Sequence, residues 1–329
     1  MSIRDAINKI PGANKAYQNI MLRKEYAYDR KFFYKNYSRS SESKNKIGYN
    51  CLLICHALEK GMSNKNPRRF GRAKVEDLIK LLEKYESYDD YKEDFAYINS
   101  VSALREYVAF YGKKNWTDAD EYNYVKQFLE SHKGIKNVDA GSYVLKKSDF
   151  EKDAKIDYRK FLASRHSIRE FAPKRIGGGD IKKAIEAAIL SPSACNRQMC
   201  KVYYSTDKKI VEKIIKIGQG FSAFNKETIN PLVVTFDINA NSFVGERNQG
   251  WFNAGLFSMN LVNALHSQGI GSCFIQFGNK SFEEEELKKI LDIPSSERVA
   301  VIIAAGYYCD ENTVLRSPRK SIDDIYRER

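Results

Sequence analysis

The spacing of apolar residues changes near residue 156, and this change constrains the fold more than any other feature of the sequence. From Ile3 to about Phe150 the spacing is helical, with little of the alternation that is typical of strands. After Tyr158, short apolar runs alternate with helical segments. We therefore predict a helical N-terminal extension over 1–150, packed on the core, and a second domain over 156–329 that combines helices with a sheet.

Four helices are predicted within the extension. The clearest covers 74–85, where apolar side chains recur at intervals of three and four residues and so fall on one face. The others are expected at 45–60, 91–111 and 118–130. The polar and weakly patterned stretch 134–155 is the candidate linker between the two domains.

The loop between the first two of these helices, Gly61–Arg72, holds three arginines close to Phe70. Two interpretations remain open. The loop either reaches over a substrate or cofactor pocket, or it is an ordinary surface loop.

In the second domain, strands are predicted at 201–205, 232–236 and 299–308, and the last is apolar enough to be a buried central strand. A helix is expected over 180–190 with Asp180 as its N-cap. This order of elements indicates an α+β or α/β core.

The segment Phe252–His266 is apolar on nearly every face of the helix that it is expected to form. A helix that is apolar all round is normally buried on all sides. We therefore expect this helix to be enclosed completely.

Composition excludes several classes of protein. The apolar fraction of 43% suffices for a folded core, but the longest apolar runs are far shorter than the ~20 residues that a membrane span requires. Asp5 and Asn8 fall where a secretory signal carries its apolar stretch. The six cysteines have the spacing of neither a disulfide framework nor a zinc site, so we predict no metal site and interpret them as buried small hydrophobes. A cytoplasmic protein is expected.

The formal charge of +13 is strong and uneven. Residues 1–160 hold 32 Lys and Arg against 23 Asp and Glu, an excess of +9, whereas 161–329 hold 23 against 19, an excess of +4. No nucleic-acid-binding motif accompanies the charge, which argues against a nucleic-acid partner and for a solvated basic helical surface. Capture of an anionic substrate or partner is the alternative.

The segment Ser164–Phe171 places two arginines and two hydroxyls within six residues, just before a helix-forming stretch. Arginine offers a planar set of donors that matches phosphate, and hydroxyls add shorter hydrogen bonds that fix its orientation. This pattern predicts an anion-binding site.

Three further segments follow in a characteristic order. They are Ser191–Gln198, which contains Pro192, Ser193, Ala194 and Asn196, the segment Gly269–Cys273, interpreted as a turn, and a basic tail with Arg316 and Arg319. With the anion motif, this order resembles the FMN-dependent nitroreductase superfamily over roughly residues 160–325. The helical extension before it is unusual for a minimal nitroreductase.

The resemblance implies a three-layer α/β/α core with a mixed, mainly antiparallel sheet. It implies that FMN is the cofactor, bound at the interface of a homodimer, and that the helix at 252–266 lies at the centre of that interface. The implied FMN contacts are Arg165, His166, Ser167, Arg169, Pro192, Ser193, Ala194, Asn196, Gln276, Phe277, Arg316 and Arg319.

The roles of these residues also follow from the resemblance. Arg165 and Ser167 would hold the phosphate, and Arg169 would tune the flavin by approaching its N1/C2 carbonyl edge. Ser193 and Asn196 would reach the flavin of the neighbouring subunit, so that the site exists only in the dimer. No catalytic side chain is predicted, because flavin N5 is itself the reactive centre.

Two positions depart from the family pattern. Met199 and Cys200 stand where the family frequently has Pro-Trp, and Phe277 stands where glycine is common. The pocket wall and the local geometry at these positions are expected to differ from those of the family.

The resulting hypothesis is an FMN-dependent oxidoreductase with a ping-pong cycle, in which NAD(P)H donates hydride and a small-molecule acceptor, nitroaromatic or quinone-like in vitro, receives it. One alternative is a specialised flavin enzyme that does not use NAD(P)H, of the dehalogenase, flavin-fragmenting or azoline-oxidase type. Another is a basic binding module whose first 150 residues recruit an anionic polymer while the flavin domain is vestigial.

Overall fold

The computed structural model describes residues 13–37, 43–144, 156–218, 220–221, 224–275, 277, 280–315, 317 and 319–329. The predicted linker, 134–155, is described only as far as residue 144, and the predicted boundary between residues 150 and 156 lies outside the described residues, so this division remains a prediction. None of the helices within the described ranges is long and apolar enough to cross a bilayer.

Before residue 145 the described elements are helical, as predicted. They are α2 (Ala13–Tyr37), α3 (Lys44–Met62), α4 (Arg72–Tyr85), the short 3₁₀ helix η1 (Tyr91–Glu93), α5 (Phe95–Lys113) and α6 (Asp120–Ser131). The segment predicted as one helix over 91–111 divides at Asp94, because the Asp94 side chain caps α5 by accepting a hydrogen bond from the backbone N–H of Ala96 at 3.0 Å.

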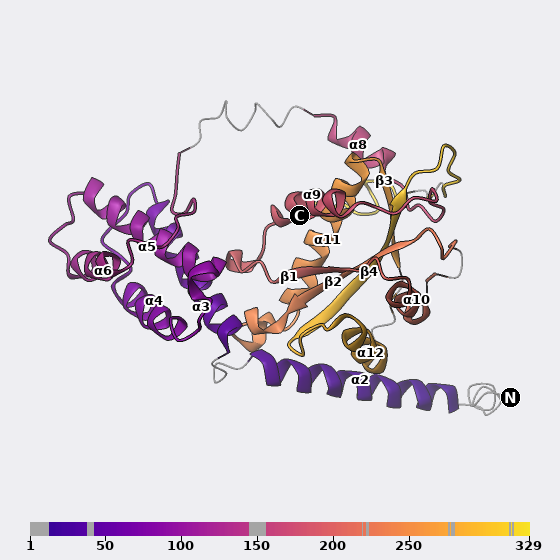
Figure 1. The fold of residues 1–329 in the computed structure, drawn as a ribbon, viewed down its shortest axis with the longest axis horizontal. Helices are drawn as coiled ribbons and strands as arrows, with labels where there is room; N and C mark the ends of the chain where they lie inside the picture. The colour runs from indigo at the N-terminus through magenta and orange to yellow at the C-terminus, as the bar shows by residue number, and fades with distance from the viewer. Residues whose placement is uncertain are drawn as a thin grey trace.

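Helices α3 to α6, called the helical unit below, lie together at one end of the molecule (Figure 1). They have an apolar core of their own. The predicted apolar face of α4 supplies Val75, Leu78 and Leu82, which are fully buried against α3 and α5. The hydroxyls of Tyr107 and Tyr111 both donate to the backbone carbonyl of one residue, Phe70.

The Gly61–Arg72 loop packs on the helical unit itself. The Phe70 ring contacts the rings of Tyr107 and Tyr111. Arg69 forms a 2.6 Å ion pair with Asp118, beside the start of α6. The interpretation as a surface loop therefore fits the contacts of the described residues better than a cover over the second domain.

Within its described residues, the second half of the chain contains eight regular helices and strands after α8 (Tyr158–Ser164). In chain order these are α9 (Gly178–Ile189), β1 (Cys200–Tyr204), α10 (Lys208–Ile217), β2 (Asn230–Asp237), α11 (Gln249–Ser267), β3 (Ile270–Ile275), α12 (Ser281–Leu291) and β4 (Glu297–Tyr307), with the 3₁₀ turns η2 (Ala194–Asn196), η3 (Ile238–Ala240) and η4 (Val244–Glu246). The three strands predicted from the sequence are confirmed within two residues.

The strands form one sheet in the order β1-β2-β4-β3, with every neighbouring pair antiparallel. A single parallel bridge joins Ser167 to Ser272 at the β3 edge. The sheet is therefore mixed and mainly antiparallel, as the resemblance implied.

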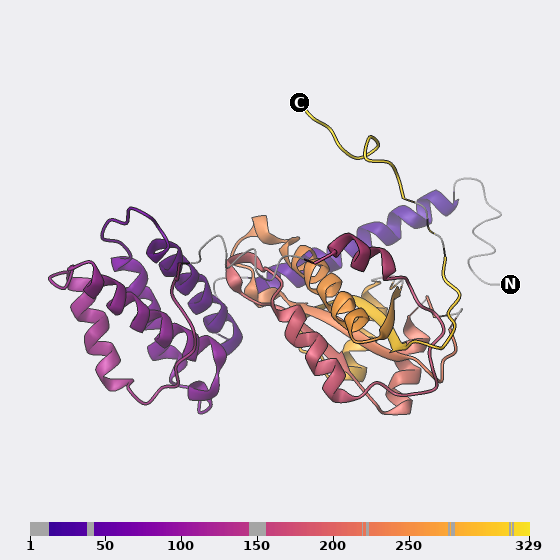
Figure 2. The same cartoon turned by 90° about the horizontal axis from the view of Figure 1, so that it is seen from above.

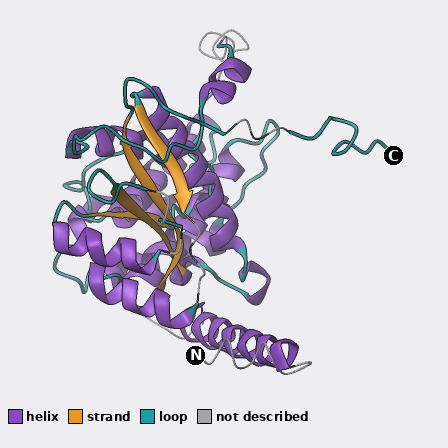
Figure 3. Ribbon diagram, turned by 90° about the vertical axis from the view of Figure 1, so that its right-hand side faces the viewer, coloured by secondary structure: helices purple, strands orange, loops and turns teal. Residues whose placement is uncertain are grey.

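Helices cover both faces of this sheet (Figure 3). On β4, Ile302 and Ala304 pack toward α10 and α12, whereas the alternate residues Ile303 and Ala305 pack toward α9 and α11. All four side chains are fully buried. This two-sided burial produces the α/β/α layers.

The segment Gly269–Cys273 was interpreted wrongly as a turn. Only Gly269 is in a turn conformation, with φ of +74°, and β3 begins at Ile270. The strand is hard to recognise because Gly271 interrupts its apolar pattern. A Cβ at Gly271 would lie 2.9 Å from the Ile168 side chain, so glycine allows the anion motif to pack against the sheet.

The role predicted for Asp180 was also wrong. Gly177 is the N-cap of α9, and Asp180 lies within the first turn, where its carboxylate accepts a 2.6 Å hydrogen bond from the hydroxyl of Tyr307. The carboxylate also suits the positive end of the helix dipole.

Helix α11 is not enclosed on all sides within one chain. Phe257, Leu261 and Leu265 face the sheet, but Phe252 is 64% exposed and Met259 is 38% exposed. The expectation of complete burial is wrong for the single chain, because no described element covers this stripe.

Helix α2 lies along α12 and joins the N-terminal half to the core (Figure 1). The Tyr28 hydroxyl donates to Glu285 at 2.5 Å, and Asp29 forms a 2.9 Å ion pair with the buried Arg298. The helical unit makes its own contact through α3, where Asn45 donates to Asp237 at 3.4 Å. Figure 2 shows the helical unit beside the core.

Candidate functional site

The predicted anion motif is held at the edge of the sheet. Helix α8 ends at Ser164, and the backbone N–H of Ile168 donates to the carbonyl of Ser272 in β3 at 3.0 Å. Ile168 and Phe171 are buried, and Phe171 fits against β4 because residue 306 is glycine, where a Cβ would lie 2.4 Å from the ring. These contacts fix the backbone between them.

The polar side chains of the motif line a cavity of about 270 Å³, called the basic pocket below. Its lining is Leu162, Ala163, Arg165, His166, Ser167, Arg169, Leu315, Ser317 and Arg319. The fold thus brings Arg319 from the C-terminal tail to the motif. Five of the predicted FMN contacts meet in this one place.

The positive charge of the basic pocket has no carboxylate to balance it. No acidic residue belongs to its lining, and within the described ranges neither Arg165 nor Arg169 forms an ion pair. Among the described residues, Arg169 donates to the carbonyl of Ser167, at 3.3 Å. Unpaired guanidinium groups beside a hydroxyl form a site whose chemistry suits a phosphate-like anion.

His266 of α11 supports the start of the motif. Its Nε2 lies 2.8 Å from the hydroxyl of Ser164, and its Nδ1 lies 2.7 Å from the hydroxyl of Tyr308. Burial, with the nearby Arg165 and His166, lowers the pKa of His266. The neutral ring with its proton on Nε2 satisfies both contacts, since the Ser164 hydroxyl itself donates to Phe161.

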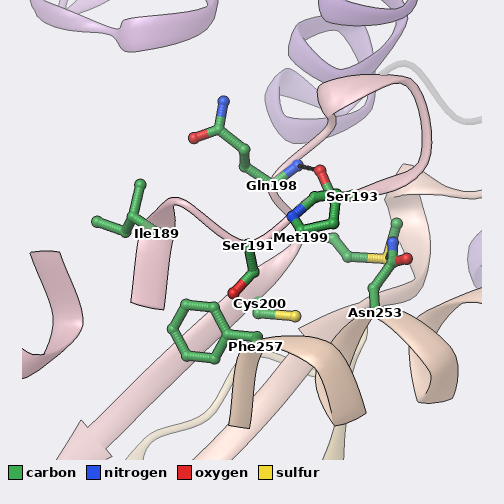
Figure 4. A pocket seen from close by; sticks show the side chains of 9 residues that line it. Ile189, Ser191, Ser193, Gln198, Met199, Cys200, Asn253 and Phe257 are labelled. Carbon is green, nitrogen blue, oxygen red and sulfur yellow. Dashed lines mark hydrogen bonds between the residues drawn. The ribbon is translucent and has the colours of Figure 1, made fainter. Parts of the chain in front are cut away.

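A second cavity, called the apolar pocket below, lies beside the segment Ser191–Gln198, around Ser193 (Figure 4). Its volume is about 190 Å³, and it is lined by Ile189, Ser191, Pro192, Ser193, Gln198, Met199, Cys200, Asn253 and Phe257. No lysine, arginine, aspartate or glutamate lines it. Burial raises the pKa of the Cys200 thiol to about 12, so the thiol is protonated at neutral pH.

The loop above this pocket has an unusual backbone. Cys195, Asn196 and Gln198 have φ of 52°, 51° and 49°, in the left-handed region that non-glycine residues rarely adopt. The backbone N–H of Gln198 donates to the Ser193 hydroxyl at 2.9 Å (Figure 4). Such conformations persist only where surrounding contacts impose them.

Arg197 provides those contacts. Its side chain is fully buried; Nε donates to the carbonyl of Ala194 at 2.9 Å, and Nη1 donates to the carbonyl of Ala240. Both terminal nitrogens pair with Glu246, at 2.9 and 2.6 Å. Burial alone raises the pKa of Glu246, but hydrogen bonds from Arg197 and from the backbone of Ser242 outweigh it and hold the pKa below its ordinary value.

Sequence reasoning missed Arg197, Glu246 and His266. Arg197 occupies a variable position of the motif, and its partner lies 49 residues further along the chain. The four histidines are scattered, so no local pattern marks His266.

Among the described residues, the remaining predicted FMN contacts do not line the basic pocket. Pro192 and Ser193 line the apolar pocket, and Ala194 and exposed Asn196 form the adjacent turn η2. Phe277 is half-buried against the core beneath α10 and α12. Gln276 and Arg316 lie outside the described residues.

The basic pocket and the apolar pocket share no residue within one chain.

A sequence profile described as "Nitroreductase family" matches residues 162–229 and 231–307. The C-terminal half of this chain belongs to the nitroreductase family. It is 26% identical over 172 residues to an Archaeoglobus fulgidus protein named "Putative NADH dehydrogenase/NAD(P)H nitroreductase", an alignment that covers 52% of this chain and 97% of the relative. It is 27% identical over 203 residues to a Streptococcus pyogenes protein named "Putative NAD(P)H nitroreductase Spy0809". This alignment covers 50% of this chain and 96% of the relative.

Among solved structures, a nitroreductase family protein of Streptococcus pneumoniae is 24% identical, with a TM-score of 0.45, and the match covers 53% of this chain and all of the other. These matches concern the half of the chain that carries both pockets. The sequence profile and the two relatives indicate a nitroreductase-type oxidoreductase.

Replacing Glu246 tests the support of the η2 loop. In Glu246→Gln the buried guanidinium loses its counter-charge, so we expect a loss of about 2–3 kcal/mol in the free energy of unfolding at pH 7, measured with urea. Because the folded pKa of Glu246 is lowered, its contribution is present above the ordinary carboxylate pKa and is lost as the pH falls below it.

The difference between wild type and Glu246→Gln should therefore shrink toward pH 3. Glu212→Gln, an exposed site on α10, is the matched control and should be neutral at both pH values. An undiminished difference at low pH would contradict the assigned ion pair.

Proposed function

We propose that this chain is an FMN-dependent oxidoreductase that accepts hydride from NAD(P)H and passes it to a small-molecule acceptor such as a nitroaromatic or a quinone. The basic pocket carries the proposal, because it combines unpaired arginines with a hydroxyl at the motif that resembles the family's phosphate site. The names of the A. fulgidus and S. pyogenes relatives, which include NAD(P)H, support the choice of donor.

The residues present fit the phosphate of FMN. A phosphate monoester carries nearly two negative charges, and Arg165, Arg319 and the Ser167 hydroxyl offer donors to it from one pocket without a competing carboxylate. Bound here, FMN would supply hydride acceptance and release at its ring, while the protein supplies binding and orientation.

Arg169 is assigned to the flavin ring rather than to the phosphate. Its guanidinium lies in the same pocket as Arg165 and, among the described residues, donates to the carbonyl of Ser167. A fixed positive charge beside the ring favours whichever redox state carries more negative charge.

A homodimer would complete the site. The basic pocket and the apolar pocket are separate within one chain, and the family resemblance implies that Ser193 and Asn196 serve the neighbouring subunit. The exposed stripe of α11, with Phe252 and Met259, is the surface that pairing of two chains would cover.

The apolar pocket supports an uncharged acceptor. It presents no ionic side chain, and the neutral thiol of Cys200 cannot act as a nucleophile at pH 7. The apolar pocket would therefore bind an acceptor through apolar contacts and hold it close to the flavin.

Removal of Arg165 tests the phosphate assignment. Arg165→Ala should weaken FMN binding by about 10- to 100-fold, because a charge-assisted contact is lost, as measured by quenching of flavin fluorescence in a titration of the apoprotein. Arg159→Ala, an exposed arginine on α8 outside the pocket, should bind as wild type does. Equal affinity of the two variants would place the phosphate elsewhere.

Removal of Arg169 should instead change the redox potential. We expect Arg169→Ala to retain flavin and to lower its two-electron midpoint potential by about 30 mV or more, since 1.4 kcal/mol corresponds to about 30 mV for such a couple. Spectroelectrochemistry or equilibration with a reference dye measures this. An unchanged potential in a variant that keeps its flavin would refute the assigned role.

The dimer is tested at the exposed stripe. Met259→Glu places a charge on this surface and should yield a monomer by light scattering, with weakened FMN binding. Phe282→Glu, at a 58% exposed aromatic residue of α12, is the control and should leave the mass of the assembly unchanged. A Met259→Glu protein that remains dimeric would show that another surface makes the contact.

A further inference from the structure

A third cavity lies away from both pockets, where the helical unit meets the core. It has a volume of about 470 Å³, and we call it the lysine cleft. Its lining is Lys46, Asn50, Leu53 and Ile54 of α3, Asp77, Lys80, Leu81 and Lys84 of α4, and Ser242 of the core. It shares no residue with the pockets proposed for FMN and the acceptor.

Lys46 is the unusual member of this lining. The residue is only 3% exposed, and within the described residues its ammonium donates to the backbone carbonyl of Tyr37 at 3.1 Å without pairing with a carboxylate. Burial lowers the pKa of Lys46, and no acid among the described residues offsets that effect. A buried ammonium without a counter-charge is costly, and a bound anion would relieve the cost.

The other charged groups of the cleft are also mainly positive. Lys80 and Lys84 are four residues apart in α4 and so lie on the same face of the helix. Asp77 is the one acid in the lining. The lining residues, three lysines and one aspartate, thus carry a formal positive charge.

The walls between these charges are apolar. Leu53, Ile54 and Leu81 are half-buried, and Ile54 and Leu81 pack from behind on the core of the helical unit. The exposed lining of the basic pocket is more polar than that of the lysine cleft, so the two cavities suit different anions.

We propose that the lysine cleft binds an amphipathic organic anion, with its apolar body against Leu53, Ile54 and Leu81 and its single carboxylate or sulfonate head at Lys46 and Lys80. The cleft volume lies in the range of small-molecule sites. The proposal does not depend on FMN binding or on the oxidoreductase activity.

Such a ligand would contact both halves of the chain. Lys46 and Lys80 belong to the helical unit, whereas Ser242 belongs to the core. The backbone N–H of Ser242 donates at 2.7 Å to Glu246, the partner of Arg197. The cleft therefore adjoins the contacts that hold the η2 loop.

The test uses the full-length protein and 8-anilinonaphthalene-1-sulfonate, whose fluorescence rises on binding. The uncharged N-phenyl-1-naphthylamine has the same aromatic body without the sulfonate. Titrations compare wild type with Lys80→Glu and with Lys74→Glu. Both lysines are exposed on α4, but only Lys80 lines the cleft, so neither change threatens folding and the second is a matched control.

We expect Lys80→Glu to weaken binding of the sulfonate dye by about tenfold or more, and Lys74→Glu to leave it unchanged. Lys46→Gln should weaken it similarly. The neutral dye should bind wild type more weakly and should not discriminate between the variants. Superimposable titrations of the sulfonate dye on all proteins, or equal losses in Lys80→Glu and Lys74→Glu, would overturn the proposal.

Discussion

The burial of β4 on both faces is the constraint on which the second half of the molecule depends. A strand whose alternate residues, such as Ile302 and Ile303, are both fully buried requires a helical layer on each side of the sheet. The same strand positions the candidate site, because Gly306 leaves room for Phe171 and so anchors one end of the anion motif. Packing of the core thereby determines where Arg165 presents its charge.

The N-terminal half is joined to this core by polar contacts and by a shared apolar cluster, in which Phe32 of α2 packs with Met199 and Phe236. The helical unit has its own apolar interior, whereas α2 is held by the ion pair between Asp29 and Arg298, which also contacts the buried carboxylate of Glu284. Buried ion pairs contribute modestly to stability but penalise alternative arrangements. This network and the apolar contacts of Phe32 together hold α2 on the core.

The sequence allowed prediction of those features that short-range patterns determine. The helix at 74–85 and the central strand followed from periodicity, and the anion motif from its residue types. Features that arise from contacts distant in sequence were not predictable. No short sequence pattern predicts the ion pair between Arg197 and Glu246. None predicts that Asp180 accepts a hydrogen bond from Tyr307 rather than capping its helix. The complete burial expected of α11 is not reached within one chain, where Phe252 and Met259 stay exposed.

The central claim is that this chain transfers hydride from NAD(P)H through a bound flavin. Its most direct test is the visible spectrum of the FMN-loaded protein under anaerobic conditions as NADH or NADPH is added. The account predicts rapid loss of the absorbance near 450 nm, characteristic of oxidised flavin, with at least one of the two donors. Flavin that stays bound and oxidised with both donors would contradict it and would favour a specialised flavin enzyme that does not use NAD(P)H.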